Sequence, residues 1–341
     1  MKSIFMGTPD FAVGTLRSLA EAGHEITLVV SQPDKPKGRG HAMVPTPVKV
    51  VAEELGIPVF QPVKIREAKD VLEMTPVKAK ALELGIPVLQ PKRVRDPEFV
   101  EQLRELKPDV MVVVAFGQIL TKEVLEVPKY GCINVHGSLL PKYRGAAPIQ
   151  WAVIDGEKES GVTIMQMDEG LDTGDMLAKA IVPLDEKETG GSLFDKLSEA
   201  GGRLCVETLA KLEKGEIIPE KQGESPTAYA SMLDKKMGNI DWNKSAVVIE
   251  RLVRGLNPWP SAYTHLDGKT LKIWACDVLP QSASKGESGE ILEVTKDAIH
   301  VQTGDGILVL REIQLAGKAR MDAGAFLRGY KVVPGTVLSA E

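Results

Sequence analysis

Three polar side chains in this sequence are of the types that an acyl-transfer reaction needs. Asn134 and His136 lie two residues apart, and Asp172 follows in the segment Gly-Leu-Asp-Thr-Gly-Asp at 170–175. In an extended strand, residues two apart point to the same face, so the amide and the imidazole face the same way. A carboxylate on a nearby loop would orient the imidazole and favour its charged form. Together they would place an amide donor, a cationic acid and a carboxylate around one reacting carbonyl.

These groups need a strand to position them, and the sequence provides one. The apolar run at 131–135 predicts a buried strand with the two polar residues at or near its carboxyl end, where open parallel sheets carry their reacting groups. The first half of the chain alternates such strands with amphipathic helices, which is typical of a parallel sheet covered by helices on both faces. The other predicted elements of this half are strands at 2–6, 26–31 and 110–115 and a helix at 11–22.

The residue composition changes at a stretch rich in Glu, Lys, Pro and Gly, which we interpret as a linker over 215–228. It separates an α/β domain at 1–214 from a C-terminal domain at 229–341. In the second domain a helix at 245–256 is followed by short alternating segments that Asp-Gly and Gly-Asp-Gly turns join. This pattern predicts a small antiparallel β-barrel of the OB type.

A tandem duplication interrupts the first domain between about 46 and 95. Thr-Pro-Val-Lys at 46–49 recurs at 75–78, and Gly-Ile-Pro-Val at 56–59 recurs at 85–88, each with an offset of 29 residues. A solenoid needs at least three repeats, so two copies indicate a local insertion of one helix-plus-strand unit. The sheet needs only one copy, and the sequence leaves open which one it uses.

The composition predicts a cytoplasmic enzyme with room for two domains. The chain has 341 residues and a net charge of -5, which excludes a global attraction to nucleic acid, so such binding needs a local basic patch. The cysteines Cys132, Cys205 and Cys276 are odd in number and far apart, which is typical of a reducing compartment. We expect no metal, because no ligand spacing for one is present. We also expect neither a secretory signal nor a membrane span.

One basic segment has two interpretations. Lys35, Lys37 and Arg39 lie in the Gly- and Pro-rich stretch 33–47. A charged run of this kind is either a solvated loop or a mobile arm that grips phosphates. The residues by themselves favour neither interpretation.

The tryptophans of the second domain are interpreted as structural. Asn-Pro-Trp-Pro at 257–260 follows the predicted helix, and we interpret it as a rigid helix stop with a packed Trp259. We expect Trp242 and Trp274 in the core of the barrel.

The sequence resembles the methionyl-tRNA formyltransferases over nearly its whole length. The resemblance is carried by Met-Gly-Thr-Pro-Asp-Phe-Ala at 6–12, the basic segment at 33–40, and the blocks at 134–150, 161–177 and 256–260. The central block is shared with other enzymes that use 10-formyltetrahydrofolate, so it specifies the formyl donor. The N-terminal block, the basic segment and the C-terminal domain narrow the acceptor to tRNA. The family pattern has one copy of the Gly-Ile-Pro-Val unit, so the duplication differs from the family. It raises the question of how the basic segment is attached to the sheet.

The resemblance implies a Rossmann-like parallel-sheet formyltransferase domain followed by an OB-like domain that helps to hold tRNA. It implies Asn134, His136 and Asp172 as the catalytic set. The implied tRNA contacts are Lys35, Lys37 and Arg39, on an arm that enters the acceptor end. The residues that it places around the folate are Ser138, Leu139, Leu140, Pro141, Phe116, Gln118, Ile119, Leu120, Asp168 and Gly170.

The activity that the resemblance implies is transfer of the formyl group of 10-formyltetrahydrofolate to the α-amino group of methionyl initiator tRNA, by a monomer, for translation initiation. No covalent enzyme intermediate is expected, because no Ser or Cys lies beside a base. Two alternatives stay open. One is an enzyme of the same chemistry that acts on a small amine or hydrolyses the donor, and the basic segment and the barrel argue against it. The other is an inactive tRNA-binding relative, and the intact catalytic set argues against that.

Overall fold

Two structural units share the chain, and each contains segments that are distant in sequence. The computed structural model describes residues 1–7, 9–31, 35–37, 42–60, 93–116, 118–280 and 286–339. The N-terminal unit consists of Met1–Arg144, Gly161–Val182 and Asp195–Ala228. The C-terminal unit consists of Gly145–Ser160, Pro183–Phe194 and Tyr229–Glu341. The segment at 215–228, interpreted from the sequence as a linker, thus clusters with the N-terminal unit. None of the helices in these residues is long and apolar enough to cross a membrane.

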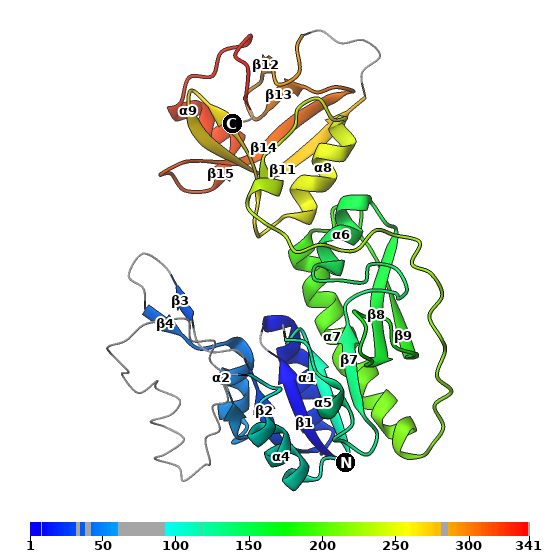
Figure 1. The fold of residues 1–341 in the computed structure, drawn as a ribbon. Helices are drawn as coiled ribbons and strands as arrows, with labels where there is room; N and C mark the ends of the chain where they lie inside the picture. Colours follow the sequence, from blue (N-terminus) through cyan, green and yellow to red (C-terminus); the bar gives the residue numbers. More distant parts are fainter. Residues whose placement is uncertain are drawn as a thin grey trace. The chain divides into compact units, whose positions relative to one another are not determined.

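The sheet of the N-terminal unit has seven strands within the described residues (Figure 1). Their order is β5 (Val59–Phe60), β2 (Glu25–Val30), β1 (Lys2–Gly7), β6 (Val110–Val114), β7 (Cys132–His136), β8 (Glu159–Gln166) and β9 (Met176–Pro183). From β5 to β7 neighbouring strands run parallel, whereas β8 runs antiparallel to β7. The parallel part confirms the predicted Rossmann-like sheet. The antiparallel β8 is an addition that the sequence pattern did not indicate.

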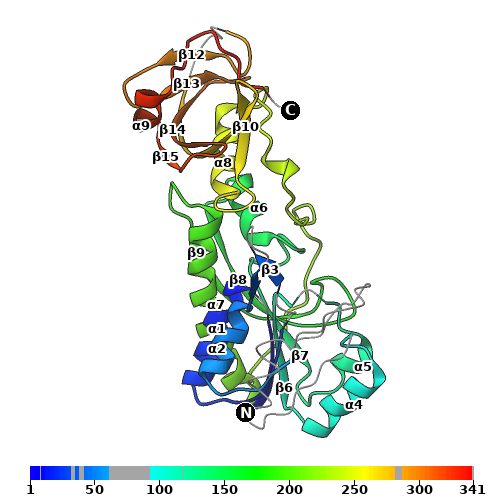
Figure 2. The same cartoon turned by 90° about the vertical axis from the view of Figure 1, so that its left-hand side faces the viewer.

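Helices cover both faces of this sheet (Figure 2). One face carries α1 (Asp10–Glu21), α2 (Pro47–Glu54) and α7 (Gly190–Glu213), and the other carries α4 (Pro97–Leu106) and α5 (Lys122–Leu125). The helices α1 and α7 approach each other closely at Gly14. A Cβ atom at this position would lie only 2.7 Å from Ser198 Oγ, so the glycine makes room for the contact. On the opposite face, strand residues two apart, such as Ile4 and Met6, are buried in one apolar cluster with α4. The alternation of side chains along β1 thus packs one set of them against α4.

The first copy of the duplicated segment supplies α2 and β5. The side chain of Thr46 caps α2 by accepting from the backbone N–H of Lys49 at 3.4 Å, and Pro47 begins the helix. At the edge of the sheet, Val59 of β5 pairs with Val29 of β2. The repeated motifs of the second copy, at 75–88, lie outside the described residues.

An antiparallel sheet of six strands forms the C-terminal unit in the described part of the chain. Its order is β10 (Ala262–Leu266), β11 (Lys269–Leu279), β14 (Ile307–Leu315), β13 (Ile299–Gln302) and β12 (Ile291–Val294), and β15 (Met321–Asp322) pairs with β14. The C-terminal segment connects the two edges, because Ser339 bridges His265 of β10 and Val337 bridges Glu290 beside β12. The sheet therefore closes into the small barrel predicted from the sequence.

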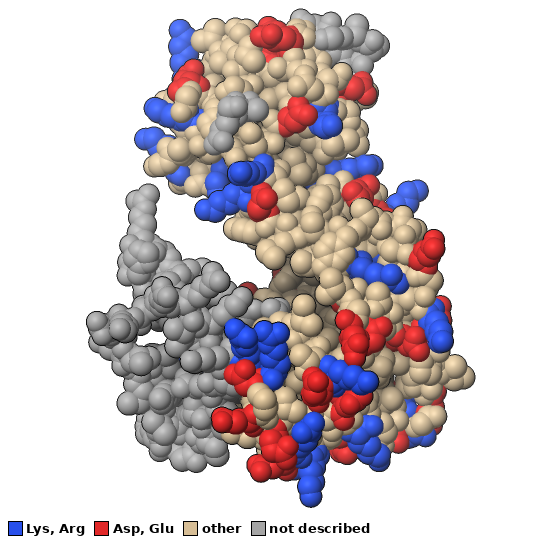
Figure 3. Space-filling view, viewed as in Figure 1, with Lys and Arg blue, Asp and Glu red and all other residues tan. Residues whose placement is uncertain are grey.

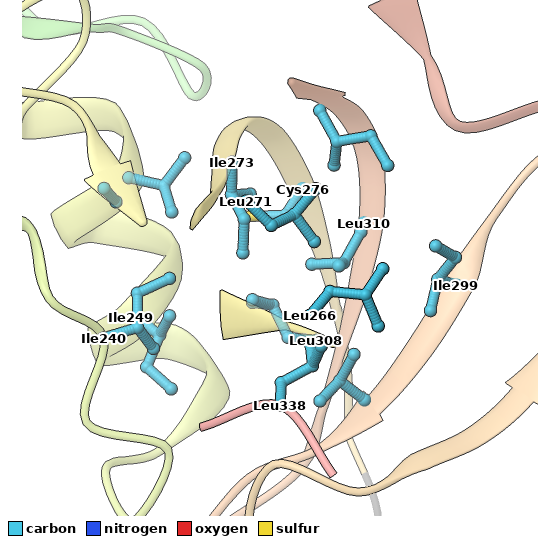
Figure 4. Packing of buried hydrophobic residues seen from close by; sticks show 14 of the residues in the cluster. Ile240, Ile249, Leu266, Leu271, Ile273, Cys276, Ile299, Leu308, Leu310 and Leu338 are labelled. Atoms are coloured by element: carbon cyan, nitrogen blue, oxygen red, sulfur yellow. The ribbon is translucent and has the colours of Figure 1, made fainter. Parts of the chain in front are cut away.

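The core of this barrel combines residues of its strands with residues of its helices (Figure 4). Ile249 of α8 (Ala246–Gly255) faces Leu308 and Leu310 of β14 in the same apolar cluster. Leu338 of the closing segment is 1% exposed and belongs to this cluster, so burial as well as backbone pairing holds the closure. The remaining elements of the unit are α6 (Pro148–Asp155), the 3₁₀ helix η1 (Lys236–Gly238) and α9 (Ala323–Gly329).

Of the three tryptophans interpreted as packed, only Trp242 is buried, with 4% exposure. The helix α8 ends at Gly255, before the Asn-Pro-Trp-Pro motif, as the stop predicts. Trp259 is nevertheless 55% exposed, so its predicted packing is wrong. Trp274 is half-buried on β11, where it alternates with the buried Ile273 and therefore lies on the outer face of the barrel. The proline pattern and the apolar composition did not reveal which way these indoles point.

Candidate active site

Strand β7 presents Asn134 and His136 on one face. The intervening Val135 and the preceding Ile133 are buried, and their burial fixes the strand between β6 and β8. His136 is 5% exposed and Asn134 is half-buried. Because β7 ends at His136, both polar side chains lie at the carboxyl edge of the parallel part of the sheet.

Asp172 lies on the loop between β8 and β9 and faces both of these side chains. Its Oδ1 atom is 3.5 Å from Asn134 Nδ2 and 3.7 Å from His136 Nδ1. The backbone of Asp172 has a φ of 55°, a left-handed conformation that costs a residue with a Cβ atom roughly 1–2 kcal/mol. The surrounding structure therefore has to hold this residue. The amide, the imidazole and the carboxylate singled out in the sequence meet at one point.

A backbone carbonyl fixes the orientation of the imidazole. Nε2 of His136 lies 3.0 Å from the carbonyl oxygen of Tyr143. A carbonyl oxygen only accepts, so Nε2 carries the hydrogen and donates. Nδ1 is then the nitrogen that faces Asp172 and can exchange a proton. Tyr143 was not predicted from the sequence, because its contribution is a backbone carbonyl that any residue carries.

Thr163 of β8 binds the turn after β7, and it is a second residue that was not predicted from the sequence. Thr163 Oγ1 donates to the carbonyl of Ser138 at 2.7 Å and accepts from the N–H of Leu140 at 3.0 Å. The Ser138 hydroxyl donates to a backbone carbonyl within the turn, and the Leu140 side chain is buried. Ligand contacts from this turn would therefore come from backbone groups and from the half-buried Leu139 and Pro141.

The predicted folate residues at 116–120 differ in accessibility. Phe116 and Leu120 are 2% and 3% exposed and belong to the core beneath the sheet, and Gln118 is half-buried. Ile119 is 74% exposed. In this segment Ile119 is thus the apolar side chain available to a ligand, and its buried neighbours hold it in place.

Asp168 and Gly170 organise the loop that carries Asp172. Asp168 Oδ1 accepts from the N–H of Gly170 at 3.0 Å and from Thr173 Oγ1 at 2.9 Å. These bonds close the loop on itself and leave Leu171 at 58% exposure beside the carboxylate. The loop therefore offers a second accessible apolar side chain near Asn134 and His136.

Comparison with known proteins places this geometry in a family. The formyl transferase family matches residues 1–209, and the formyl transferase C-terminal domain matches residues 232–331. The methionyl-tRNA formyltransferase of Agathobacter rectalis is 55% identical over 336 residues, which cover 98% of this chain and 99% of the relative. The chain belongs to the methionyl-tRNA formyltransferase family. A second member, from Lachnospira eligens, is 52% identical over 342 residues, which cover 99% of each chain.

Solved structures show the fold of this methionyl-tRNA formyltransferase family member in more distant proteins. WlaRD, a sugar 3N-formyl transferase solved in the presence of dTDP and 5-N-formyl-THF, is similar with a TM-score of 0.61. The similarity covers 94% of this chain and 99% of that chain at 17% identity. At this identity the likeness shows a shared fold.

The basic segment of this family member forms a hairpin. The strand β3 (Lys35–Lys37) pairs antiparallel with β4 (Ala42–Val44). Lys35 and Lys37 thus lie on a strand, and Arg39, the third predicted tRNA contact, lies outside the described residues. The described residues of the segment are therefore extended and paired with each other, and do not form an irregular loop.

The outer face of the barrel carries an aromatic side chain with two cations near its ring. Lys272 Nζ lies 5.5 Å and Arg320 Cζ lies 4.6 Å from the centre of the Trp274 ring. Glu312 holds Arg320 through bonds of 2.7 and 2.6 Å, which raise the pKa of the guanidinium. Figure 3 shows several Lys and Arg side chains close together on the C-terminal unit. Such aromatic and cationic surfaces stack bases and bind phosphates.

The cysteines take no part in this chemistry. Burial raises the pKa of Cys132 and that of Cys205 to about 12, and it raises the pKa of Cys276 as well. The thiols are therefore protonated at neutral pH and poor nucleophiles. Among the residues described, no group of three or more His, Cys, Asp and Glu side chains could hold a metal ion.

Proposed function

We propose that this protein transfers the formyl group of 10-formyltetrahydrofolate to the α-amino group of methionyl initiator tRNA. The observation that carries the proposal is the convergence of Asn134 Nδ2 and His136 Nδ1 on Asp172 Oδ1, at 3.5 and 3.7 Å. Two hydrogen-bond donors close to one carboxylate can stabilise the oxyanion of the tetrahedral intermediate in an acyl transfer and accept the proton that is released. The full-length relatives named methionyl-tRNA formyltransferase support the identity of the donor and the acceptor.

In the first step the α-amino nitrogen attacks the formyl carbon, and a C–N bond forms. The carbonyl oxygen becomes an oxyanion, which Asn134 Nδ2 and protonated His136 Nδ1 stabilise by donating hydrogen bonds. Asp172 accepts the proton that the attacking amine loses, directly or through a water molecule. Tyr143 keeps the imidazole in place through the bond at Nε2.

In the second step the oxyanion collapses and the bond between the formyl carbon and N10 of the folate breaks. N10 takes up a proton, so tetrahydrofolate leaves as a neutral amine and the formyl group remains on the amino nitrogen of methionine. We assign the delivery of this proton to His136 Nδ1, and Asp172, whose Oδ1 is 3.7 Å from it, returns a proton to the imidazole. The proton balance of the cycle closes without a covalent enzyme intermediate.

The folate is expected to lie along the carboxyl edge of the sheet. Ile119 and Leu171, which are 74% and 58% exposed, supply apolar contacts for the pterin ring system. Backbone groups of the turn from Ser138 to Pro141 supply polar ones. The presence of 5-N-formyl-THF with WlaRD, a formyl transferase of the same fold, supports a folate donor.

Two surfaces are proposed to hold the tRNA. The hairpin of β3 and β4 carries Lys35 and Lys37 and is joined to the sheet through α2 and β5. The barrel carries Trp274, with Lys272 and Arg320 near its ring. A mildly acidic protein needs such local sites to attract a polyanion. We propose that the enzyme works as a monomer in the cytoplasm, where charged initiator tRNA is used.

The proposal is tested by offering several acceptors to the purified protein. It is incubated with 10-formyltetrahydrofolate and either methionyl initiator tRNA, free methionine or no acceptor, and formyl transfer and donor loss are followed. Transfer confined to the charged tRNA is the expected result. Donor loss without tRNA would instead indicate a hydrolase or a small-amine transferase. Binding of tRNA without any donor loss would indicate an inactive relative.

A further inference from the structure

The segment from Glu220 to Thr227 runs along the catalytic side of the N-terminal unit and is anchored there by its backbone. Glu220 and Met176, the first residue of β9, exchange backbone hydrogen bonds of 2.9 and 2.8 Å. This pairing begins four residues after Asp172 along the β8–β9 loop. The segment is therefore attached to the strand that follows the catalytic carboxylate.

Gln222 holds the backbone of Asp172 directly. Its Nε2 donates to the carbonyl of Asp172 at 2.9 Å and to the carbonyl of Gly174 at 2.8 Å. Its Oε1 accepts from Nε and Nη2 of Arg144 at 2.9 and 2.8 Å. The carboxamide thus uses both donors and both lone pairs, and its orientation is fixed because carbonyls face one end and a guanidinium the other.

Thr227 holds the other side of the site. Its Oγ1 accepts from the N–H of Tyr143 at 2.8 Å, and the carbonyl of the same Tyr143 accepts from His136 Nε2. Arg144 follows Tyr143 and also donates to the carbonyl of Gly223 at 2.9 Å. One short segment therefore reaches both residues that fix the relative position of the imidazole and the carboxylate.

The backbone conformations at these two places need such support. Asp172 and Tyr143 have φ values of 55° and 57°, in the left-handed region. Each conformation costs roughly 1–2 kcal/mol and persists only where neighbouring bonds impose it. Gln222 donates to the carbonyl of Asp172, and Thr227 accepts from the N–H of Tyr143. Each of the two conformations is thus held by one of these bonds.

We propose that Gln222 and Thr227 are positioning residues of the formyl transfer, which set Asp172 and His136 relative to each other. This inference rests on the proposed function. It predicts that their loss lowers kcat and leaves substrate binding nearly unchanged, since neither side chain is assigned to either substrate. A misplacement of about 1 Å at a reacting group costs up to roughly 100-fold in rate.

The test uses variants of the full chain that keep the size of each side chain. Gln222→Glu still accepts from Arg144, but it places an oxygen against the two carbonyls that Nε2 now serves. Thr227→Val removes the acceptor, whereas Thr227→Ser keeps it. Glu224→Gln, an exposed substitution in the same segment, is the matched control.

We expect Gln222→Glu and Thr227→Val to lower kcat about 10- to 100-fold, with each KM within about twofold of the wild-type value. Thr227→Ser and Glu224→Gln are expected to keep wild-type kcat.

A second readout separates this inference from the proposed function. Amide hydrogen exchange is measured on the same variants, and exchange should accelerate in peptides covering 167–175 for Gln222→Glu and 138–145 for Thr227→Val. Unchanged kcat, or losses that only follow KM or thermal stability, would overturn the positioning role. A wild-type protein that transfers nothing to tRNA would overturn the proposed function, and the exchange data would then decide the positioning role alone.

Discussion

The imidazole of His136 donates its Nε2 hydrogen to the carbonyl oxygen of Tyr143, 3.0 Å away. This one bond divides the two ring nitrogens between two tasks. Nε2 is used to hold the ring, and Nδ1 is left on the side of Asp172 and Asn134. The chemistry that the account assigns to His136 therefore belongs to Nδ1.

Replacement of His136 should separate these two tasks. His136→Gln can still donate to Tyr143 from an amide placed like Nε2, but it has no group in place of Nδ1. We expect kcat to fall roughly 100- to 1,000-fold for both His136→Gln and His136→Ala, because each loses an oxyanion donor and an acid. Asn134→Ala should lose a similar factor. Steady-state kinetics with thermal unfolding as the folding control measure this, and near-normal turnover of His136→Gln would contradict the role of Nδ1.

Neutralising the hairpin should weaken tRNA binding without affecting the folate. Lys37→Gln is expected to raise the Kd for tRNA and to reduce the slope of log Kd against log salt by about 1, since one phosphate contact is lost. The matched control is Lys122→Gln on α5, where the lysine is exposed and 3.8 Å from Glu126. Filter binding over a series of salt concentrations measures both variants. Equal slopes for wild type, Lys37→Gln and Lys122→Gln would exclude the hairpin from the tRNA interface.

Trp274 should contribute to tRNA affinity by stacking. Trp274→Ala is expected to raise the Kd for tRNA roughly 5- to 150-fold, because a stacked base contributes about 1–3 kcal/mol. Trp274→Phe keeps an aromatic face and should lose less. Turnover at saturating tRNA should stay normal in both variants. An unchanged Kd for the alanine variant would show that this face of the barrel does not contact tRNA.

Removal of one copy of the duplication should leave the enzyme active. Deletion of residues 62–90, which is 29 residues, joins Gln61 to Pro91 and restores a single repeat. It keeps α2, β5 and the buried Val94, which is 1% exposed. We expect the deletion variant to fold and to transfer formyl groups at a rate close to that of the full chain. An unfolded or inactive product would show that the second copy is required.

The cysteines should resist alkylation in the folded protein. Cys132, Cys205 and Cys276 are all buried and free, and burial raises the pKa of Cys132 and that of Cys205 to about 12. At pH 8, well below these values, the thiols are protonated, and thiols react slowly with iodoacetamide. Mass spectrometry should find all three unmodified in the native protein and all three modified after unfolding. Rapid modification of Cys205 in the native state would contradict the packing of α7.

The sequence predicted the parts of this structure that follow a local periodicity. The strand at 131–135 and the helix at 245–256 are observed within one residue at each end, as Cys132–His136 and Ala246–Gly255. The two-residue spacing placed Asn134 and His136 on one face of β7, because alternation in a strand follows from backbone geometry. These predictions needed no knowledge of distant contacts.

What the sequence could not reveal depends on hydrogen bonds from side chains to backbone groups. The Tyr143 carbonyl and the bond from Gln222 to Asp172 join positions 7 and 50 residues apart, and neither leaves a motif. The stretch around Gln222 has the composition of a linker, although its side chain holds the Asp172 loop. Trp274 was expected in the core of the barrel, but its position beside the buried Ile273 on a strand puts it on the outer face.

The central claim is that this constellation moves a formyl group onto the amino group of a charged tRNA. The most direct test is a single-turnover reaction of the wild-type protein and His136→Gln with formyl-labelled 10-formyltetrahydrofolate and methionyl initiator tRNA. The ester is then hydrolysed, and the released amino acid is identified by mass spectrometry. We predict labelled N-formylmethionine from the wild-type protein and almost none from His136→Gln in the same time. Label released as formate, or equal yields from the two proteins, would contradict it.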